Sequence, residues 1–412
     1  MNSNFIIKKK KTLDPILELY RGKIYCNIIN FFIYIVTHYL EKEIFNIKKS
    51  YQRTLTNILS SWMFNLYINN SNQLNSDPFI PIDCSDIEIL KITLLDFCKY
   101  SINIKDYNSI IDTILIEFLE YYKNQYKTLD NYKKSLFYMT EKKNYKIQKH
   151  KILQKRNALD ISFYKFTINI KFTINNARLQ NILNNILIPE NVYKKMILNY
   201  SGDTTVVDEY IWSIVFRYQL LGSNNNQLGI LPNIINNMIC DYNINFECFA
   251  SAINFTLKKY CSIYYDLEQY FGSKGNFFNY KFIEGGFTFN PPYQKKIIDE
   301  GVDKLLLYLN RAKESNKILT FILTIPIWDK EGQKEIKYEN KIDYGDFEVI
   351  ELLKQSEFFR GIRTIHKENF TYIDHNFQLF KNKTIQNTYV IAISSNELDF
   401  NKILNYNFMN TL

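Results

Sequence analysis

Residues 286–326 constrain the fold of this chain more than any other segment. Residues 286–289 form a short apolar stretch typical of a buried strand, and residues 294–313 follow with apolar side chains at helical spacing. A second buried strand over 318–326 ends at a proline. Strand, loop, helix and strand in this order form the βαβ unit of a doubly wound sheet, in which ligands lie beyond the carboxyl ends of the strands. The loop before the helix is therefore a candidate site.

That loop reads Asn290-Pro291-Pro292-Tyr293 and suits methyl transfer onto a planar nitrogen. An adenine amine, like a carboxamide nitrogen, attacks a methyl group only when its delocalised lone pair becomes localised. The Asn290 side-chain oxygen and the Pro291 carbonyl can accept the two amine hydrogens, because the following proline has no N–H. Tyr293 offers a flat face for a flipped base, worth about 1–3 kcal/mol. A strand-ending turn would use the same residue types.

The chain divides into two predicted domains. Residues 12–158 show helical periodicity with few strand signals, residues 166–174 alternate as a half-exposed strand, and a second helical stretch runs from 177 to 200. The cluster at 201–204, Ser-Gly-Asp-Thr, marks the boundary. The expected domains are a mostly helical one over 1–200 and an α/β one over 201–412.

The net charge of +9 suits a polyanionic partner, although a coding bias that enriches lysine explains it equally well. Between residues 123 and 156 the sequence holds eleven basic side chains and two acidic ones. Such a run is either a solvated face or a stripe that follows RNA phosphates.

The six cysteines show no CxxC pair and no disulfide-like spacing, which favours a reducing intracellular compartment and argues against a metal site. The apolar stretch 25–40 is only about 16 residues long and contains polar residues, so we expect a buried helix and no membrane partner. The lysines at 8–11 are followed by no small-residue cleavage pattern of a signal peptide. Nuclear and cytoplasmic locations fit equally well.

Five sequence blocks occur in a fixed order from residue 209 onward. They are Ile211-Trp212 with Phe216-Arg217-Tyr218-Gln219; Phe246-Glu247-Cys248-Phe249-Ala250-Ser251 with Asn254; Tyr260-Cys261-Ser262 with Tyr270 to Gly275; Asn290 to Tyr293; and Ile325-Pro326-Ile327-Trp328. In this order they resemble the catalytic domain of the phosphorylated-CTD-interacting-factor family, the cap-specific adenosine N6-methyltransferases of messenger RNA. The resemblance is strong over 209–330 and weak elsewhere.

The resemblance implies a Rossmann-like class I methyltransferase domain preceded by a helical domain. It also implies S-adenosylmethionine as methyl donor and capped mRNA as partner, with N6 of the cap-adjacent 2′-O-methyladenosine as acceptor. The implied catalytic residues are Asn290, Pro291, Pro292 and Tyr293. The implied donor contacts are Phe246, Glu247, Ala250, Ser251, Asn254, Asn290 and Gln294. The implied substrate contacts are Tyr293, Lys295, Trp328, Asp329 and Lys330.

The residues themselves leave part of this open. Ala250 and Ser251 are small enough to admit the methionine part of a donor, but their block lacks a glycine-rich turn and also reads as a plain core strand. Glu247 fits a buried acid, a helix-cap partner or a donor contact. Lys295 and Asp329 depart from the family pattern, which has an acidic residue and an arginine there.

Cap recognition would also need cations for the triphosphate. The candidates are Arg21 and Arg53, with Arg360 or Arg363 near the C-terminus, and each also suits an ordinary surface position. The three tryptophans, Trp62, Trp212 and Trp328, are too far apart for a WW module, so no WW-mediated binding to a polymerase tail is expected.

Other functions use the same features. The tetrapeptide also suits a DNA adenine methyltransferase or a methyltransferase of protein glutamine amides, although the block at 246–254 argues against both. A catalytically silent RNA-binding scaffold would explain the departures, but it has no chemical reason to keep Asn290 to Tyr293 intact.

Overall fold

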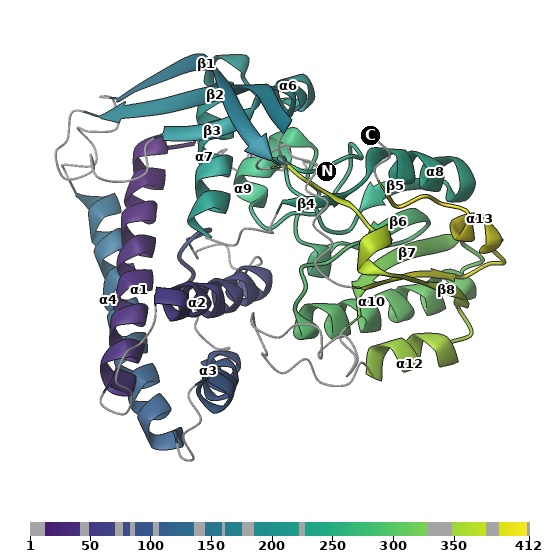
Figure 1. Cartoon of the computed structure of the whole chain (residues 1–412), viewed down its shortest axis with the longest axis horizontal. Coiled ribbons are helices and arrows are strands. Elements are labelled where there is room, and N and C mark those ends of the chain that lie inside the picture. Colours follow the sequence, from purple (N-terminus) through teal and green to yellow (C-terminus); the bar gives the residue numbers. More distant parts are fainter. Residues whose placement is uncertain are drawn as a thin grey trace, which may run out of the picture.

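A five-stranded mixed sheet carries the predicted loop (Figure 1). Three of its strands are parallel, and β10 runs antiparallel to both of its neighbours. In spatial order the strands are β5 (Ile244–Glu247), β6 (Gly285–Phe289), β7 (Leu319–Pro326), β10 (Thr388–Ser394) and β8 (Phe359–Ile365). The parallel pair β6 and β7, joined by α10 (Lys295–Glu314), confirms the predicted βαβ unit.

The structure is a computed structural model. It describes residues 13–41, 49–70, 77–82, 87–101, 107–135, 145–158, 161–174, 185–221, 227–327, 348–375 and 387–409.

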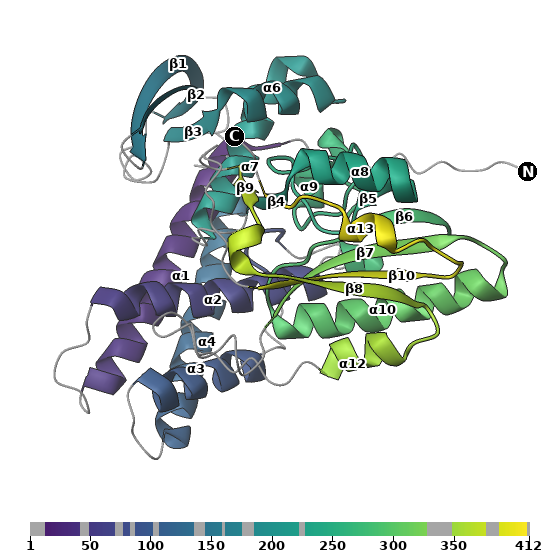
Figure 2. The same cartoon turned by 45° about the vertical axis from the view of Figure 1, so that its right-hand side comes forward.

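Helices cover both faces of this sheet (Figure 2). On β7, Phe321, Leu323 and Ile325 pack into one core with α10 and α12 (Glu348–Gln355). Ile322 points the other way, into a core with α8 (Pro232–Tyr242) and α13 (Asn401–Leu404). Every residue of β7 is buried, which explains why its sequence is continuously apolar instead of alternating. This part of the chain is a layered α/β structure.

Four long helices come before the sheet, and an apolar core shared with α7 (Val207–Leu220) holds them together. Trp212 and Phe216 of α7 are fully buried in the same cluster as Tyr25 and Phe32 of the first helix. The four are α1 (Pro15–Glu41), α2 (Lys49–Asn70), α3 (Ile87–Ser101) and α4 (Asn108–Lys134). The core thus crosses the position where the sequence suggests a domain boundary. The stretch 25–40 lies within α1 as expected, and none of the helices in the described ranges has the length and apolarity to cross a bilayer.

A small antiparallel sheet interrupts the helical half. It consists of β1 (Tyr145–Ala158), β2 (Ile161–Ile174) and β3 (Asn185–Pro189), and α6 (Glu190–Asn199) follows. The strand expected at 166–174 is confirmed. The expectation of helix is wrong for 145–158, which pairs with β2 along its whole length, and for 185–189. Strand formation here depends on the pairing partner, which single-segment periodicity does not show.

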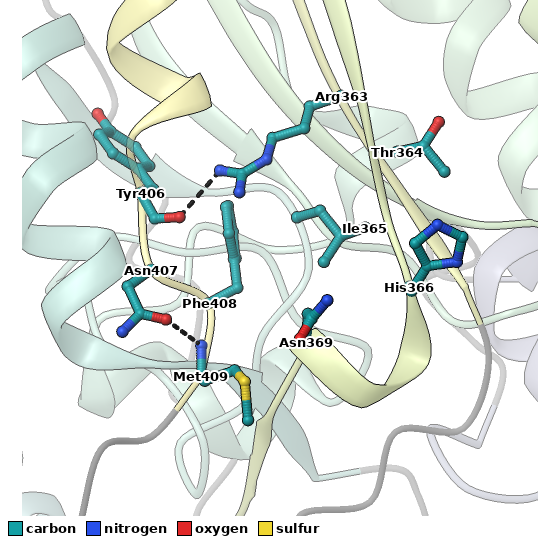
Figure 3. A pocket seen from close by; sticks show the side chains of 9 residues that line it. All are labelled: Arg363, Thr364, Ile365, His366, Asn369, Tyr406, Asn407, Phe408 and Met409. Carbon is teal, nitrogen blue, oxygen red and sulfur yellow. Dashed lines mark hydrogen bonds between the residues drawn. The ribbon is translucent and has the colours of Figure 1, made fainter.

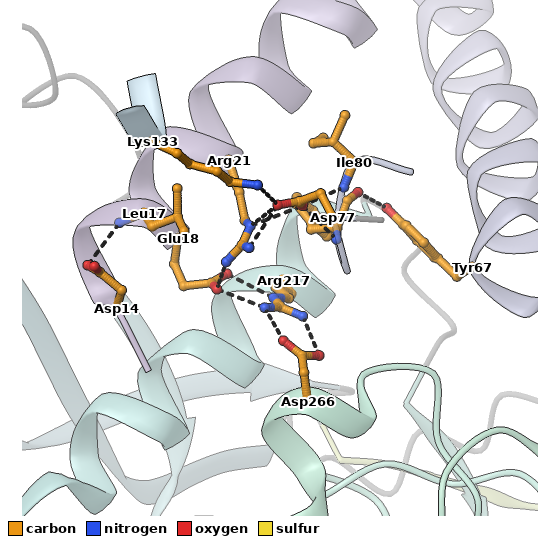
Figure 4. A network of polar contacts seen from close by, with 11 residues as sticks. Asp14, Leu17, Glu18, Arg21, Tyr67, Asp77, Ile80, Lys133, Arg217 and Asp266 are labelled. Carbon is orange, nitrogen blue, oxygen red and sulfur yellow. Dashed lines mark hydrogen bonds and ion pairs between the residues drawn. The ribbon is translucent and has the colours of Figure 1, made fainter. Parts of the chain in front are cut away.

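Six charged side chains form a buried network between the helices (Figure 4). Arg217 of α7 is fully buried and bonds two carboxylates, Glu18 of α1 at 2.7 and 2.8 Å and Asp266 of α9 (Tyr265–Glu268) at 2.7 and 2.9 Å. Arg21 bonds Glu18 and, through two nitrogens, Asp77. Lys133 of α4 completes the network at 2.8 Å from Asp77. Three cations balance three anions, and five separate segments meet around them: α1, the segment 77–82, α4, α7 and α9.

Candidate active site

The loop Asn290–Tyr293 begins directly after β6, at the carboxyl end of the parallel strands. Close packing of α10 fixes its position, because a Cβ on Gly301 of α10 would lie 2.6 Å from the Phe289 ring. Only a glycine allows this approach. The helix therefore starts immediately behind the loop, as the sequence predicts.

Two acceptors of this loop have no protein partner in the described ranges. Neither the Asn290 carboxamide nor the Pro291 carbonyl takes part in a hydrogen bond there, whereas the Pro292 carbonyl accepts from the Gln294 N–H at 2.7 Å. Asn290 is half-buried and Pro291 is buried. Both oxygens thus have bonding capacity left for an incoming donor group.

Tyr293 is held by a residue that the sequence did not single out. Its hydroxyl hydrogen-bonds the hydroxyl of Tyr372, which is buried on β9 (Tyr372–Asp374). β9 pairs with β4 (Leu228–Ile230) in a separate two-stranded sheet. The bond fixes the orientation of the Tyr293 ring from a segment nearly eighty residues away, and no motif around Tyr372 signals it.

The helical half reaches this loop through α2. The Asn65 amide donates to the Gln294 side-chain oxygen at 3.2 Å, and the Asn276 amide donates to the Ile68 carbonyl at 2.9 Å. Gln294 therefore faces α2 with its side-chain oxygen. Lys295 forms an ion pair with Asp299 one turn further along α10, at 2.6 Å.

The block at 246–254 divides into core and loop. Phe246 is buried against Tyr280 and Phe287, so its side chain belongs to the core and not to a donor site. The Ser251 hydroxyl donates to the Gln227 side-chain oxygen at 2.6 Å, and the Asn254 oxygen accepts from the Ser251 N–H at 2.7 Å. This polar turn lies just beyond the carboxyl end of β5.

Three charged side chains hold the loop that follows. Glu247 accepts from the N–H groups of residues 256 and 257, each at 2.8 Å. Lys195 donates to the carbonyls of residues 253 and 255, and Glu268 accepts from the Ala252 N–H at 2.7 Å. The sequence left three readings of Glu247 open: a buried acid, a helix-cap partner or a donor contact. The structure shows a carboxylate bonded to main-chain N–H groups of a loop, and no helix begins at residues 256 and 257.

Removal of the Glu247 carboxyl from water raises its pKa to about 7, with the bonded N–H groups and Lys195 acting in the opposite direction. The folded chain then binds a proton here more tightly than the unfolded chain between pH of about 4.5 and about 7. We therefore expect the free energy of unfolding to fall as pH rises through this window and to level off above it. Glu247→Gln, which keeps an acceptor oxygen, should flatten this dependence in urea titrations. The exposed Glu284→Gln is the control, and parallel profiles for wild type and Glu247→Gln would contradict the assignment.

Two further polar groups lie at the same turn. The Gln227 amide nitrogen and the His375 Nε2 are buried and have no hydrogen-bond partner in the described part of the chain. Burial lowers the pKa of His375 to about 3, and Lys195 adds to the effect, so the imidazole is neutral. A Cβ on Gly229 would lie 3.0 Å from His375 Nε2. No spacing pattern connects residues 227, 251 and 375, so only the folded chain reveals this cluster.

Two other predicted substrate residues, Arg21 and Arg53, are not assembled at the loop. Arg21 is buried with its guanidinium bonded to Asp77 and Glu18, so the structure does not support a role in phosphate binding. Arg53 is exposed on α2. Trp328, Asp329 and Lys330 lie outside the described residues. Three lysines of the basic run form exposed ion pairs with carboxylates, which favours a solvated face there: Lys134, Lys149 and Lys151.

Comparison with known proteins supports the resemblance in sequence. Residues 190–375 match the sequence model of the family described as "Phosphorylated CTD interacting factor 1 WW domain". Two curated relatives are named "mRNA (2'-O-methyladenosine-N(6)-)-methyltransferase". The one from Mus musculus is 32% identical over 124 residues, which cover 29% of this chain and 17% of the relative. The one from Homo sapiens is 28% identical over 155 residues, which cover 35% and 22%. The similarity therefore extends over less than a quarter of each relative.

The description of the matching family includes a WW domain. The comparison therefore gives no support to the expectation that WW-mediated binding is absent. In this chain the matched residues run from α6 to β9 and include the parallel strands β5, β6 and β7.

Proposed function

We propose that the chain belongs, through residues 190–375, to the family of phosphorylated CTD interacting factor 1, and that it methylates N6 of the cap-adjacent 2′-O-methyladenosine of mRNA. S-adenosylmethionine would be the donor. The proposal draws on the names of the mouse and human relatives and on the chemistry of the loop after β6.

One observation carries the proposal: the two oxygens of Asn290 and Pro291 have no partner in the described ranges at the carboxyl end of β6. Each would accept one hydrogen of the adenine amine. With both hydrogens held, the nitrogen becomes pyramidal and its lone pair points toward the methyl group. Tyr293, oriented by Tyr372, would stack on the adenine ring. Loss of the amine proton follows methylation, so no general base is required before transfer.

The unpartnered polar atoms beyond β5 fit the donor. The Gln227 amide nitrogen would bind the carboxylate of the amino-acid part, since a carboxylate needs N–H or O–H donors. The Ser251–Asn254 turn would lie beside it, with the Ser251 N–H and O–H groups donated to Asn254 and Gln227. Neutral His375 would add a further polar contact. The donor supplies an electrophilic methyl group on a sulfonium, and the chain's own residues orient the acceptor toward it.

The sheet supports a Rossmann-like reading of this half. Its three parallel strands, its helices on both faces and its candidate site at the carboxyl ends agree with a doubly wound fold. We therefore assign residues 201–412 to a methyltransferase domain and residues 1–200 to substrate recognition.

A panel of acceptors tests the proposed function. The full chain and radiolabelled S-adenosylmethionine are incubated with capped RNA beginning in 2′-O-methyladenosine, the same RNA without a cap, adenine-containing duplex DNA, and a protein with an exposed glutamine. We expect label in the capped RNA alone. Equal label in uncapped RNA would exclude cap specificity. Label in DNA or protein would favour one of those acceptors. RNA binding without any label would indicate a catalytically silent scaffold.

Tyr293 variants separate the ring from the hydroxyl. Tyr293→Ala should lower kcat/KM by about 10–100-fold, because base stacking is worth about 1–3 kcal/mol. Tyr293→Phe should stay within about threefold of wild type in activity and lose about 1 kcal/mol of stability, because Tyr372 loses a hydroxyl partner. Tyr372→Phe removes the same bond from the other side and is the matched control. An inactive Tyr293→Phe with an active Tyr372→Phe would assign the chemistry to the Tyr293 hydroxyl instead.

A further inference from the structure

A polar cavity opens beside the carboxyl end of β8 (Figure 3). Its volume is about 220 Å³. Arg363, His366 and Asn369 line it from β8 and the following turn, and Asn407 and Phe408 line it from the C-terminal segment. None of its nine lining residues is acidic, and Arg363 is the only one with a permanent charge. Such a lining favours an anion.

Arg363 is held in place before any ligand arrives. Its Nη1 donates to the carbonyls of Ile403 and Tyr406, at 2.8 and 2.9 Å. The guanidinium lies over the Phe408 ring at 5.4 Å, and Phe408 itself is buried. The Nε and Nη2 groups have no partner in the described ranges. A fixed arginine with two N–H-bearing nitrogens to spare matches the geometry of a phosphate group.

The cavity is connected to the catalytic loop. Ile365, at its edge, pairs with Thr388, which pairs with Pro326 at the carboxyl end of β7, so cavity and loop lie at the same edge of the sheet. β8 is three strands from β6, or about 14 Å at the usual strand spacing. A row of four aromatic side chains links them, joined by one hydrogen bond between tyrosine hydroxyls and by two ring contacts. It runs Tyr293, Tyr372, Phe370, Phe408.

From this geometry we propose that the Arg363 cavity binds a backbone phosphate of the RNA substrate, in the segment that follows the methylated nucleotide. The inference rests on the proposed function for the identity of the substrate. Arg363 supplies two N–H donors to the phosphate oxygens, and His366 and Asn369 supply further polar contacts. The rigid aromatic row keeps the phosphate site at a constant distance from the adenine site.

RNA binding by the full chain, measured by fluorescence anisotropy, tests this inference without requiring methyl transfer. With a 3′-labelled RNA of ten nucleotides, Arg363→Gln should weaken binding about tenfold. It should also reduce the slope of log Kd against log salt by about 0.7, the value for one phosphate of a single strand. A capped dinucleotide should bind wild type and Arg363→Gln equally. Arg360→Gln is the matched control, since it removes the same charge from the other end of β8, where Arg360 bonds the carbonyls of residues 357, 359 and 396.

Single methylphosphonate substitutions along the RNA identify the phosphate. At one position the substitution should weaken RNA binding to wild type about tenfold. The same substitution should not weaken binding to Arg363→Gln any further, because the two changes remove the same interaction. Equal slopes for Arg363→Gln and wild type, or equal losses for Arg363→Gln and Arg360→Gln, would overturn the inference while leaving the proposed methyl transfer intact. If Arg363→Gln specifically loses RNA affinity but the wild-type protein methylates no RNA, the proposed function is contradicted and the phosphate site is retained. Inorganic phosphate competing as well as the RNA would show a site for free anions and would also overturn the inference.

Discussion

Asn290→Ala is expected to lower kcat on capped RNA by about 10³-fold while donor affinity stays within about tenfold. The substitution removes one of the two acceptors proposed to hold the adenine amine, and the remaining Pro291 carbonyl would not make the nitrogen pyramidal alone. The Asn290 carboxamide has no protein partner in the described part of the chain, so its loss should leave the fold stable. Single-turnover transfer and donor binding by calorimetry measure the two effects separately.

Two further variants make this result specific. Asn290→Asp keeps an acceptor oxygen and should retain more activity than Asn290→Ala. Asn310→Ala removes an exposed carboxamide from α10 and should behave as wild type. Normal turnover of Asn290→Ala, or equal loss in Asn290→Ala and Asn310→Ala, would exclude Asn290 from the mechanism.

Arg217→Ala is expected to destabilise the chain by about 3–5 kcal/mol, the usual effect of breaking a buried ion pair. Arg217 bonds Glu18 and Asp266 at once, and its removal leaves the fully buried Glu18 carboxylate with Arg21 alone. Urea denaturation measures the loss. Arg311→Ala, which removes an exposed arginine from α10, should change stability by less than about 0.5 kcal/mol.

The same network predicts a dependence on acid. Burial alone would raise the pKa of Glu18, but Arg217 and Arg21 outweigh it and leave the pKa below its ordinary value. Burial would also raise the pKa of Asp77, but Arg21 and Lys133 outweigh it and leave this pKa below its ordinary value. Both carboxylates therefore stabilise the fold above their unfolded pKa values near 4, and this contribution disappears as pH falls through the lower folded values. Arg217→Ala should reduce the acid sensitivity, and an unchanged acid transition would contradict the role of the network.

The sequence predicted the βαβ unit closely, because a buried parallel strand, a proline-rich loop and an amphipathic helix each have a local pattern. The predicted secondary structure was wrong where it depends on pairing with a segment distant in sequence. Residues 145–158 are rich in lysine and have no strand pattern of their own, yet β2 pairs with them throughout. Arg21 illustrates the same limit, since the sequence around a lone arginine in a helix does not show that Asp77 bonds it in the folded chain.

The candidate site shows a similar division. The tetrapeptide at 290–293 is contiguous, so its acceptors could be predicted from chemistry alone. Tyr372, Gln227 and His375 approach from separate segments and carry no motif. Arg217 lies within the block that resembles the family, and the sequence could mark it as unusual without showing that it bonds Glu18.

The apolar core that α7 shares with the N-terminal helices limits how this protein can be dissected. A fragment starting at residue 201 would expose Trp212 and Phe216 to solvent and would leave Arg217 without Glu18. It would also lose the Asn65 contact to Gln294 beside the loop Asn290–Tyr293. Activity assays on an isolated C-terminal fragment would consequently report on a damaged protein, and the smallest useful enzyme includes the helices.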